Sequence, residues 1–502
     1  MTLVLGLDVG TTTIKAAFFD LDEPVAPVAV AQAPTPRVMP APGQFEIEAE
    51  ALWEAVREVC QGAAAQAPGE PSALGISGTA CGAWLVDAGG ELTRRPILWN
   101  DGRAVDVVQE WVADGTVERI FEISGNVPYP GYTLPLLRWL REHDPDSLDR
   151  ASAVLCLKDW LRLRMTGEVF QDETDASYVP FDIKARRWSR ELAEVCGVAE
   201  DAERLLPALA EPAHTAGLRA EAAEQLGLPE GLPIALGLTD IVAATVGGGV
   251  IRPGRAVTNL GTSSFSTLVI DTCELAPHGV GITAAAPLGR WMRTMVNTSG
   301  SMTLDFAAGL VCEGDVGRMM ELAAEAEPGA DGVTMLPYLS PAGVVSPFVE
   351  PNAHGCFIGL RAGHGPREIA RAAVEGLACA IADCYSAMAT QPEQIVTVGG
   401  AARSDLLLEQ IAALTGAPVA RLDGEEFGCR GAALVAAWAA GLTGGDDGLV
   451  AAAEAIEAER VFEPGPATPG LMDRYREAAA ATRRLWSGPH WRRDSEAEEG
   501  GG

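Results

Sequence analysis

Lysine is scarce in this chain of 502 residues, which contains only Lys15, Lys158 and Lys184. None of them completes a G-x-x-x-x-G-K-[ST] pattern, so the sequence excludes a Walker-type nucleotide site. The G-x-G-x-x-G pattern of dinucleotide-binding folds and of protein kinases is also absent. Any nucleotide site in this chain must therefore use a different kind of phosphate-binding loop.

Basic residues as a whole are outnumbered, with 37 lysines and arginines against 69 acidic residues and a formal net charge of −32. Such a chain repels phosphate backbones and anionic lipid surfaces, which argues against nucleic acid and against a membrane as partners. We expect a nucleotide to be bound locally, through backbone N–H groups and a metal ion rather than through a basic field.

The sequence also lacks C-x-x-C pairs and histidines at metal-binding spacing. Four of its ten cysteines lie in apolar periodic stretches and are expected to be small buried hydrophobes in a reducing compartment: Cys60, Cys156, Cys379 and Cys384. The N-terminus has no basic region, Asp8 interrupts its apolar run, and no apolar run is long enough to span a bilayer. These features predict a cytoplasmic protein.

The length of the chain is sufficient for two domains, because a single core stops growing beyond about 250–300 residues. The turn around Pro253 favours a boundary there. We expect an N-terminal domain over residues 1–252, a C-terminal domain over 253–486 and a disordered tail over 487–502.

One local pattern, a strand followed by a glycine–hydroxyl tip and a second strand, occurs twice in the chain. Residues 3–8 and 14–19 predict strands on either side of Gly10–Thr13. Residues 255–270 repeat this pattern around Gly261–Ser264. The repetition indicates an internal duplication in which each half carries one tip.

Other segments give simpler predictions of secondary structure. Residues 73–77 and 83–86 predict strands around a tight turn, and Leu155–Thr166 predicts an amphipathic helix that stops at Gly167. The buried strand before Asp240 predicts a carboxylate at its C-terminal end. Together these segments indicate an α/β fold.

The two tips are suited to holding phosphate. Gly10 allows the backbone to approach closely, and the N–H groups and hydroxyls of Thr11 and Thr12 can bind phosphate oxygens. Asp8, at the end of the strand, could position Mg²⁺ directly or through water. A single such tip is often an ordinary hairpin, but two of them could hold one polyphosphate from both sides.

Asp240 is the candidate general base. It follows a buried strand, at the strand end where open α/β sheets bind ligands, and burial would adapt its pKa to accept a hydroxyl proton. The alternative is a helix N-cap, because a helix follows.

Two further segments could bind parts of a ligand. Gly399 and Gly400 end a buried strand and leave room for a flat ring such as adenine, although a plain turn has the same pattern. The segment Trp99-Asn100-Asp101-x-Arg103 offers groups that pair with vicinal hydroxyls, or forms a polar surface loop.

Taken together, these residues resemble the FGGY family of carbohydrate kinases, especially its xylulokinase-like members. The resemblance covers about residues 3–445 and rests on segments in family order: LGLDVGTTTIKAAFFD, PILWNDGRA, LKDWLRLRMTGE with TDAS, TNLGTSS, SPFVEPNAHGCFIGL with RAAVEGLA, and VTVGGAARSDLLLEQIAALTG. It implies a two-lobed actin/hexokinase-like (ribonuclease H-like) α/β fold, with ATP and substrate sites in the cleft between the lobes.

The resemblance also implies roles for individual residues. It assigns Asp240 as the catalytic base and Asp8 as the carboxylate associated with Mg²⁺. The expected ATP-phosphate residues are Gly10, Thr11, Thr12, Thr13, Lys15, Gly261, Thr262 and Ser263, and the expected adenosine residues are Gly399, Gly400, Ala401 and Ser404. The expected substrate residues are Thr79, Ala80, Cys81, Trp99, Asn100, Asp101, Arg103 and Asp240.

One segment departs from the family pattern. Xylulokinases typically carry Ser-Gly-Gln-Met-His-Gly where this chain has Ser77-Gly78-Thr79-Ala80-Cys81-Gly82, and a thiol is a poor hydrogen-bond partner. Loss of a designed polar contact changes discrimination on the order of 10⁴-fold, which places D-xylulose itself in doubt.

The expected activity is ATP-dependent phosphorylation of a primary hydroxyl of a pentulose or a related polyol. An erythritol- or glycerol-type polyol kinase is one alternative, and an actin-like ATPase without a sugar acceptor is another. The expected partners are ATP and a small sugar or polyol, and the resemblance is compatible with a homodimer.

Overall fold

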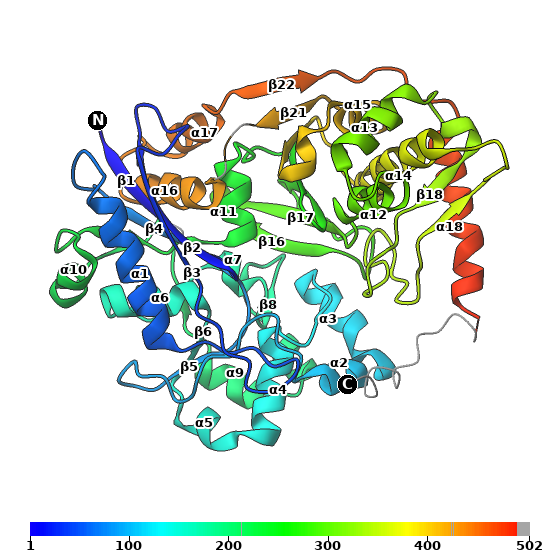
Figure 1. Cartoon of the computed structure of the whole chain (residues 1–502). Coiled ribbons are helices and arrows are strands. Elements are labelled where there is room, and N and C mark those ends of the chain that lie inside the picture. Colours follow the sequence, from blue (N-terminus) through cyan, green and yellow to red (C-terminus); the bar gives the residue numbers. More distant parts are fainter. Residues whose placement is uncertain (212, 423, 425, 489–502) are drawn as a thin grey trace.

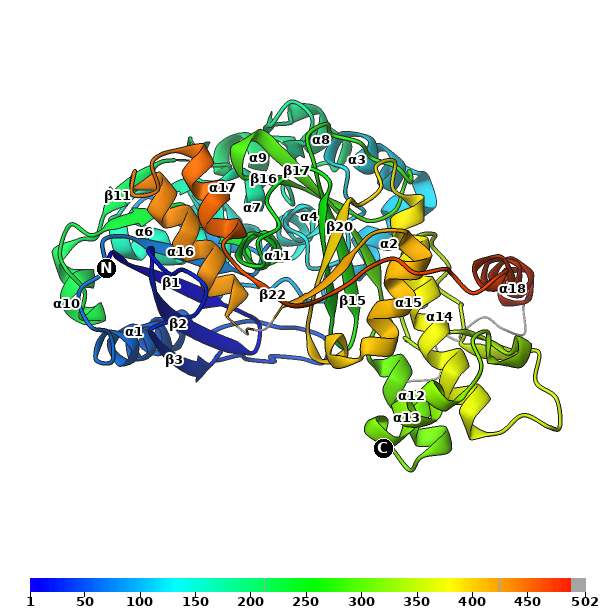
Figure 2. The same ribbon diagram turned by 90° about the horizontal axis from the view of Figure 1, so that it is seen from above.

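The computed structural model describes residues 1–211, 213–422, 424 and 426–488 of the chain (Figure 1). Almost all of the tail predicted over residues 487–502 lies outside these described residues. The described chain forms two large mixed β-sheets flanked by helices, and Figure 2 shows the sheets side by side with α11 between them.

The first sheet is built around an apolar strand near the N-terminus. The strand LVLGLDV is buried along almost its whole length, as expected for a central strand covered on both faces. In sheet order the strands are β11 (Thr215–Gly217), β12 (Pro233–Ala235), β4 (Leu74–Gly78), β1 (Leu3–Val9), β2 (Thr13–Asp20) and β3 (Ala29–Pro34), and β13 (Leu238–Thr239) also pairs with β4.

The second sheet repeats the connectivity of the first. Its strands in order are β16 (Ile282–Ala286), β17 (Arg290–Asn297), β15 (Ser264–Ile270), β14 (Arg255–Leu260), β20 (Gln394–Val398), β21 (Val419–Leu422) and β22 (Ala458–Phe462). In both sheets the first strand forms an antiparallel hairpin with the next and lies parallel to a later strand, β4 or β20. The two predicted hairpins, each with two antiparallel strands joined by a tip, are therefore confirmed.

Short two-stranded ladders complete the strand content. They pair β5 (Trp84–Val86) with β6 (Ala153–Leu155), β7 (Phe170–Gln171) with β10 (Ala208–Leu209), β8 (Phe181–Asp182) with β9 (Arg187–Trp188), and β18 (Thr334–Leu336) with β19 (Cys356–Ile358).

Some helices pack on the two large sheets, and others pack on one another. The helices are α1 (Ala49–Ala64), α2 (Val105–Asp114), α3 (Thr116–Ser124), α4 (Thr133–His143), α5 (Pro145–Arg150), α6 (Leu157–Thr166), α7 (Glu173–Ala176), α8 (Arg190–Val195), α9 (Ala199–Leu205), α10 (Ala220–Leu226), α11 (Asp240–Gly247), α12 (Met302–Val311), α13 (Val316–Glu325), α14 (Pro366–Ala387), α15 (Asp405–Thr415), α16 (Phe427–Ala439), α17 (Asp446–Glu454) and α18 (Leu471–Trp486), with short 3₁₀ turns at Pro287–Gly289, Ala330–Gly332 and Gly400–Arg403. Those that pack on the large sheets include α1, α14 and α16, and those that pack on one another include α2–α5, α8 and α9. In the part of the chain that the structure describes, every helix is too short or too polar to cross a lipid bilayer.

Two of the predicted elements need correction. The strands at 73–77 and 83–86 exist, but β4 and β5 belong to different sheets and do not form a hairpin, because the Gly82 N–H donates to the Gly131 carbonyl and carries the chain away from β4. The helix predicted from Leu155 begins at Leu157, because Leu155 is paired with Trp84 in the β5–β6 ladder.

Each sheet has its own apolar core. In the lobe that is built on the first sheet, Leu5 and Leu7 belong to the same buried cluster as Val56 of α1. In the second lobe, Leu268 belongs to the same cluster as Leu377 of α14. Burying one such side chain contributes about 1.5–3 kcal/mol. The four cysteines predicted to be small buried hydrophobes are all buried: Cys60, Cys156, Cys379 and Cys384.

Helix α16 joins the two halves of the chain, because in sequence it lies between β21 and β22 of the second sheet but it packs on the first (Figure 1). The contact is backbone against backbone. A Cβ atom on Gly6 of β1 would lie 1.9 Å from the Cys429 carbonyl oxygen, and a Cβ atom on Gly75 of β4 would lie 2.0 Å from that of Ala432. Only glycine at these positions permits so close an approach.

We therefore expect Gly6→Ala to destabilise the protein by about 1–3 kcal/mol or more, because α16 must move away from β1 to admit a methyl group. Urea denaturation would measure this as a lower midpoint. Gly309→Ala is the matched control, since at that exposed position in α12 an added Cβ would meet no described heavy atom within 4 Å beyond the local backbone of its own helix. Equal midpoints for the two variants would contradict this view of the contact.

Candidate active site

The first tip, Gly10–Thr13, connects β1 to β2 and is held by hydrogen bonds within the tip and to Thr35. The Gly10 N–H donates to the Thr13 carbonyl at 3.1 Å, and the Thr35 hydroxyl donates to the Gly10 carbonyl at 2.8 Å. Thr12 is exposed at the end of the tip. The tip therefore has a fixed backbone and presents a hydroxyl to solvent, as an anion-binding loop requires.

Trp99 connects the predicted substrate segment to this tip. Its indole N–H donates to the Thr11 hydroxyl oxygen at 2.8 Å. The adjacent Asn100 is partly buried, and its side-chain oxygen has no hydrogen-bond partner among the residues that the structure describes. The structure thus brings Trp99 and Asn100 next to a predicted phosphate-binding residue, which the spacing in the sequence could not show.

Asp101 and Arg103 bind each other rather than facing solvent. The guanidinium of Arg103 donates to both carboxylate oxygens of Asp101, at 2.8 and 2.9 Å, and to Glu46 at 2.9 Å. The Phe45 N–H adds a further bond to Asp101 at 2.6 Å. Both side chains are almost completely buried, so in this conformation they fix the loop that carries Trp99.

The two candidate carboxylates lie at the ends of two strands that both pair with β4. Asp8 is near the end of β1, and Asp240 directly follows β13, with β4 paired in parallel between them. The Ser77 hydroxyl of β4 donates to Asp8 at 2.6 Å. The C-terminal ends of parallel strands are where open α/β sheets bind ligands, so this position suits a site.

Burial affects both carboxyl groups. It raises the pKa of Asp8, and burial together with the nearby charge of Asp8 raises the pKa of Asp240 to about 7. Asp240 is the first residue of α11 and accepts a hydrogen bond from the Ile241 N–H at 2.7 Å, whereas Thr239 occupies the N-cap position. The alternative role of Asp240 as the N-cap is therefore not what the structure shows.

The start of α16 lies against Asp8. The ammonium of Lys15 pairs with Glu426 at 3.0 Å, so in this conformation a predicted phosphate ligand is partly neutralised by a carboxylate. A Cβ atom on Gly428 would lie 2.5 Å from the Asp8 Oδ2 atom. Glycine at residue 428 thus allows the helix to reach the carboxylate.

The second tip, Gly261–Ser264, is held by the loop before α12. The Gly300 N–H donates to the Thr262 carbonyl at 2.8 Å, and the Ser301 N–H donates to the Gly261 carbonyl at 2.7 Å. Thr262 is exposed, and Ser263 is partly exposed. This tip therefore matches the first in having a fixed backbone with outward hydroxyls.

A cavity of about 350 Å³ lies beside the predicted adenosine residues, and Gly400, Ala401 and Ser404 line it. Gly399 does not line it but has a φ of +96°, and a Cβ there would lie 2.9 Å from the Leu260 carbonyl group just before the second tip. Leu304 and Met320, which were not predicted from the sequence, form apolar walls of this cavity. No local signal identifies them, because they come from separate helices.

The predicted substrate residues Thr79, Ala80 and Cys81 lie beside an aromatic cluster. Thr79 and Cys81 are buried, and Cys81 has a φ of +66°. Burial raises the pKa of the Cys81 thiol well above its usual value, so it remains neutral. The ring centroids of Tyr129 and Tyr132 are 4.2 Å apart.

Tyr178 extends this cluster, with its ring centroid 5.9 Å from that of Tyr132. The sequence analysis missed all three rings. The rarity of tyrosine could have drawn attention to them, because the chain contains only six tyrosines and three of these lie together here.

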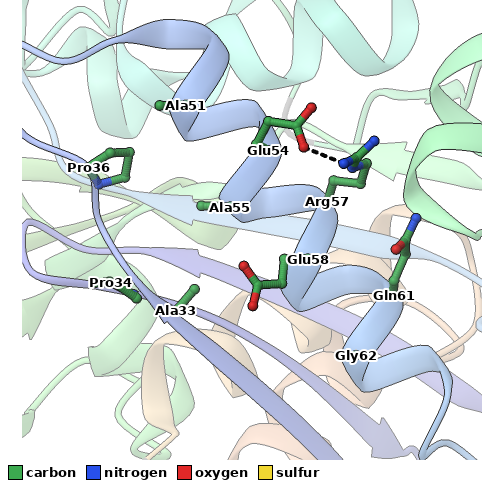
Figure 3. Close-up of a pocket in the computed structure, with 10 residues that line it drawn as sticks. All are labelled: Ala33, Pro34, Pro36, Ala51, Glu54, Ala55, Arg57, Glu58, Gln61 and Gly62. Carbon is green, nitrogen blue, oxygen red and sulfur yellow. Dashed lines mark ion pairs between the residues drawn. The ribbon is translucent and has the colours of Figure 1, made fainter.

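A larger hollow of about 900 Å³ lies elsewhere, along the outer side of the first sheet between β3 and α1. Figure 3 shows its lining, with Pro34 and Pro36 on one side and an ion pair between Glu54 and Arg57 on the other. It contains none of the predicted site residues, because β3 is the edge strand on the side remote from β4 and β13. We assign no function to it.

Comparison with known proteins gives matches along most of the chain. Models of the N-terminal and C-terminal domains of the FGGY family of carbohydrate kinases match residues 3–247 and 256–440. The xylulose kinase of Escherichia coli (strain K12) is 33% identical over 422 residues, covering 82% of this chain and 85% of the relative. The erythritol kinase of Brucella abortus (strain 2308) is 29% identical over 516 residues, covering 96% and 97%.

Among solved structures, the xylulose kinase from Rhodospirillum rubrum matches with a TM-score of 0.85 at 27% identity, covering 98% of this chain and 100% of that one. Two like sheets and these matches define a two-lobed actin/hexokinase-like phosphotransferase that acts on an alcohol group. Within that class, the chain belongs to the FGGY family of carbohydrate kinases.

The contact between α16 and Asp8 can be tested through Gly428→Ala. An added methyl group must displace the Asp8 carboxylate or the start of the helix, and a shift of about 1 Å at a catalytic group can lower the rate on the order of 100-fold. We expect acceptor-dependent ADP release to fall by that order while the protein remains folded by circular dichroism. A rate equal to that of Gly309→Ala would show that the close contact has no catalytic role.

Proposed function

We propose that this carbohydrate kinase transfers the γ-phosphate of ATP to a primary hydroxyl of a pentulose or a related polyol, with Asp240 as the base. The observation that carries the proposal is that Asp240, whose pKa is raised to about 7, and Asp8 lie at the ends of two strands that both pair with β4. A base whose pKa lies near neutrality is half ionised there and can still accept the proton of an attacking hydroxyl.

The two tips and the cavity fit an extended nucleotide. The N–H groups and hydroxyls of Gly10–Thr13 and Gly261–Ser263 bind the phosphates in this proposal, and adenosine lies in the cavity lined by Gly400, Ala401 and Ser404. The support for this is that each tip has a fixed backbone and an exposed hydroxyl. Closure of the two lobes would exclude water, so that the alcohol attacks instead.

A magnesium ion fits the donor chemistry next to the first tip. Mg²⁺ prefers carboxylate, phosphate and water oxygens, and Asp8 offers a carboxylate whose Oδ1 is already oriented by Ser77. Bound there with ATP, Mg²⁺ would neutralise the charge that develops on the transferred phosphoryl group. Asp8 then holds the ion, while Asp240 holds the proton of the acceptor hydroxyl.

The acceptor is proposed to lie between Asp240 and the tyrosine cluster. Cys81 offers a neutral thiol, and Tyr129 offers a ring and a hydroxyl, so the wall has few strong hydrogen-bonding groups. Trp99, Asn100 and Thr79 are the polar candidates near it. This composition suits a short polyol as well as a pentulose, in line with similarity to both an erythritol kinase and xylulose kinases.

Three further features of the protein are proposed together with this function. The division of the chain into domains at residues 1–252 and 253–486, a cytoplasmic location and a homodimer all stay predictions. Membership of a carbohydrate kinase family favours a sugar or polyol acceptor over an actin-like ATPase that has none.

Asp240→Asn tests the base directly. The amide has the same shape but cannot accept the proton, and loss of a general base typically costs about 10²–10⁴-fold in rate. We expect kcat to fall by this factor while the Kd of ATP, measured by calorimetry, changes less than about twofold. In the wild type, kcat/KM for the acceptor should fall as the pH drops through about 7, because Asp240 becomes protonated, and the variant should lack this limb. Near-wild-type turnover would refute the role of Asp240.

An acceptor panel tests the substrate class. ADP release should be stimulated by at least one member of a set containing D-xylulose, L-xylulose, erythritol, glycerol and hexuloses, and the phosphorylated product should carry the phosphate on a primary carbon by ³¹P–¹H NMR. Hydrolysis of ATP at a rate independent of every acceptor would instead favour an ATPase. Phosphate on a secondary carbon would overturn the proposed position of transfer.

A further inference from the structure

A buried lysine lies close to the candidate active site, but it is not one of the residues proposed to bind ATP, metal or acceptor. The ammonium of Lys158, on α6, is completely buried and contacts Asp159 at 2.7 Å, Asp175 at 2.8 Å and also Asp172. All three carboxylates are buried too. The segments that carry them, around α6 and α7, are more than 60 residues away from Asp240 in the sequence.

A chain of hydrogen bonds leads from this cluster to the residue before the base. Asp172 binds Lys158 through Oδ2, and its Oδ1 accepts both the N–H and the hydroxyl of Thr174. The hydroxyl oxygen of Thr174 in turn accepts the N–H of Thr239 at 2.9 Å. Thr239 directly precedes Asp240, so the chain ends at the backbone that carries the candidate base.

The chemistry of a hydroxyl gives this chain a direction. A threonine hydroxyl has one proton, and Thr174 commits it to Asp172, so that a lone pair faces the Thr239 N–H. The Lys158 ammonium occupies Oδ2 of Asp172, which leaves Oδ1 to accept the hydrogen bond from the Thr174 hydroxyl. On its other side, Thr239 pairs with Gly78 of β4, so its backbone is held from two directions.

Stability alone is a weak explanation for such a cluster. Taking a lysine and carboxylates out of water is costly, and buried ion pairs can often be replaced by apolar side chains without loss of stability. What an ionic cluster adds is a fixed geometry. Cys156, Asp159 and Asp175 also lie close enough together to bind a metal ion, but the Lys158 ammonium already supplies the positive charge among them.

We propose that Lys158, Asp172 and Thr174 are positioning residues that fix the backbone of Thr239 and thereby aim the Asp240 carboxylate at the acceptor hydroxyl. The inference rests on the proposed role of Asp240 as the base. The three residues are linked to one another and, through the Thr174 hydroxyl, to the Thr239 N–H, so in this proposal they act on Asp240 through Thr239.

Thr174 is the residue to change. Lys158→Met leaves buried carboxylates without their counter-charge and is expected to unfold the lobe. Thr174→Val, in contrast, keeps the shape and removes only the hydroxyl that accepts from Thr239, whereas Thr174→Ser keeps that hydroxyl. Thr267→Val is the matched control, because it removes a buried hydroxyl, bonded to Thr294 between β15 and β17, outside the site.

The measurement is steady-state ADP release with D-xylulose, or with erythritol if the acceptor panel selects it, together with thermal unfolding of each variant. We expect Thr174→Val to lower kcat on the order of 10–100-fold with KM for ATP unchanged within about twofold. Thr174→Ser should recover most of kcat, and Thr267→Val should retain the wild-type kcat even where its melting temperature falls as far.

Three outcomes would overturn the inference. Thr174→Val could be as active as Thr174→Ser, Thr267→Val could lose kcat to the same extent, or the loss could lie in KM for ATP alone. Asp240→Asn, assayed in parallel, separates the two proposals. An inactive Asp240→Asn with a fully active Thr174→Val refutes only the positioning role, whereas an active Asp240→Asn refutes the role of the base itself.

Discussion

The architecture of the site depends on one close backbone contact, that of α16 with the first sheet. Glycine at residues 6 and 75 lets the helix approach β1 and β4 until carbonyl oxygens occupy the space of the missing side chains. Gly431 continues this contact toward α11, where a Cβ would lie 1.9 Å from the Ala243 carbonyl oxygen. Because α11 begins at Asp240 and α16 begins beside Asp8, the same contact fixes the relative positions of the two carboxylates.

Because lysine is scarce, few lysine ammonium groups are available to supply positive charge to the site. Two of the three lysines in the chain are engaged by carboxylates, Lys15 by Glu426 and Lys158 by its buried cluster. In the proposed site, a phosphate tail would therefore depend mainly on backbone N–H groups, hydroxyls and a divalent cation. Burial of Asp240, together with the nearby charge of Asp8, raises its pKa to about 7, which suits proton exchange with an alcohol at neutral pH.

Much of the fold could be predicted, since both hairpins, the buried strand before Gly399 and the helix that stops at Gly167 appear in the local pattern of apolar residues and glycine. The prediction failed where a strand had to choose its partner, as for β4 and β5. Pairing across a sheet depends on residues far away in the chain, and alternation of side chains does not encode which strand is the neighbour.

The sequence by itself determined the two tips, the carboxylates Asp8 and Asp240, and the family. Each of these depends on a short run of residues whose chemistry can be recognised without knowing the rest of the structure. Only the tertiary structure decided that Asp101 and Arg103 bind each other, that three tyrosines gather beside Cys81, and that Thr174 reaches Thr239. The physical reason is that hydrogen bonds and ring contacts act over a few ångströms, and the packing of the sheets and helices sets which distant residues come within that range.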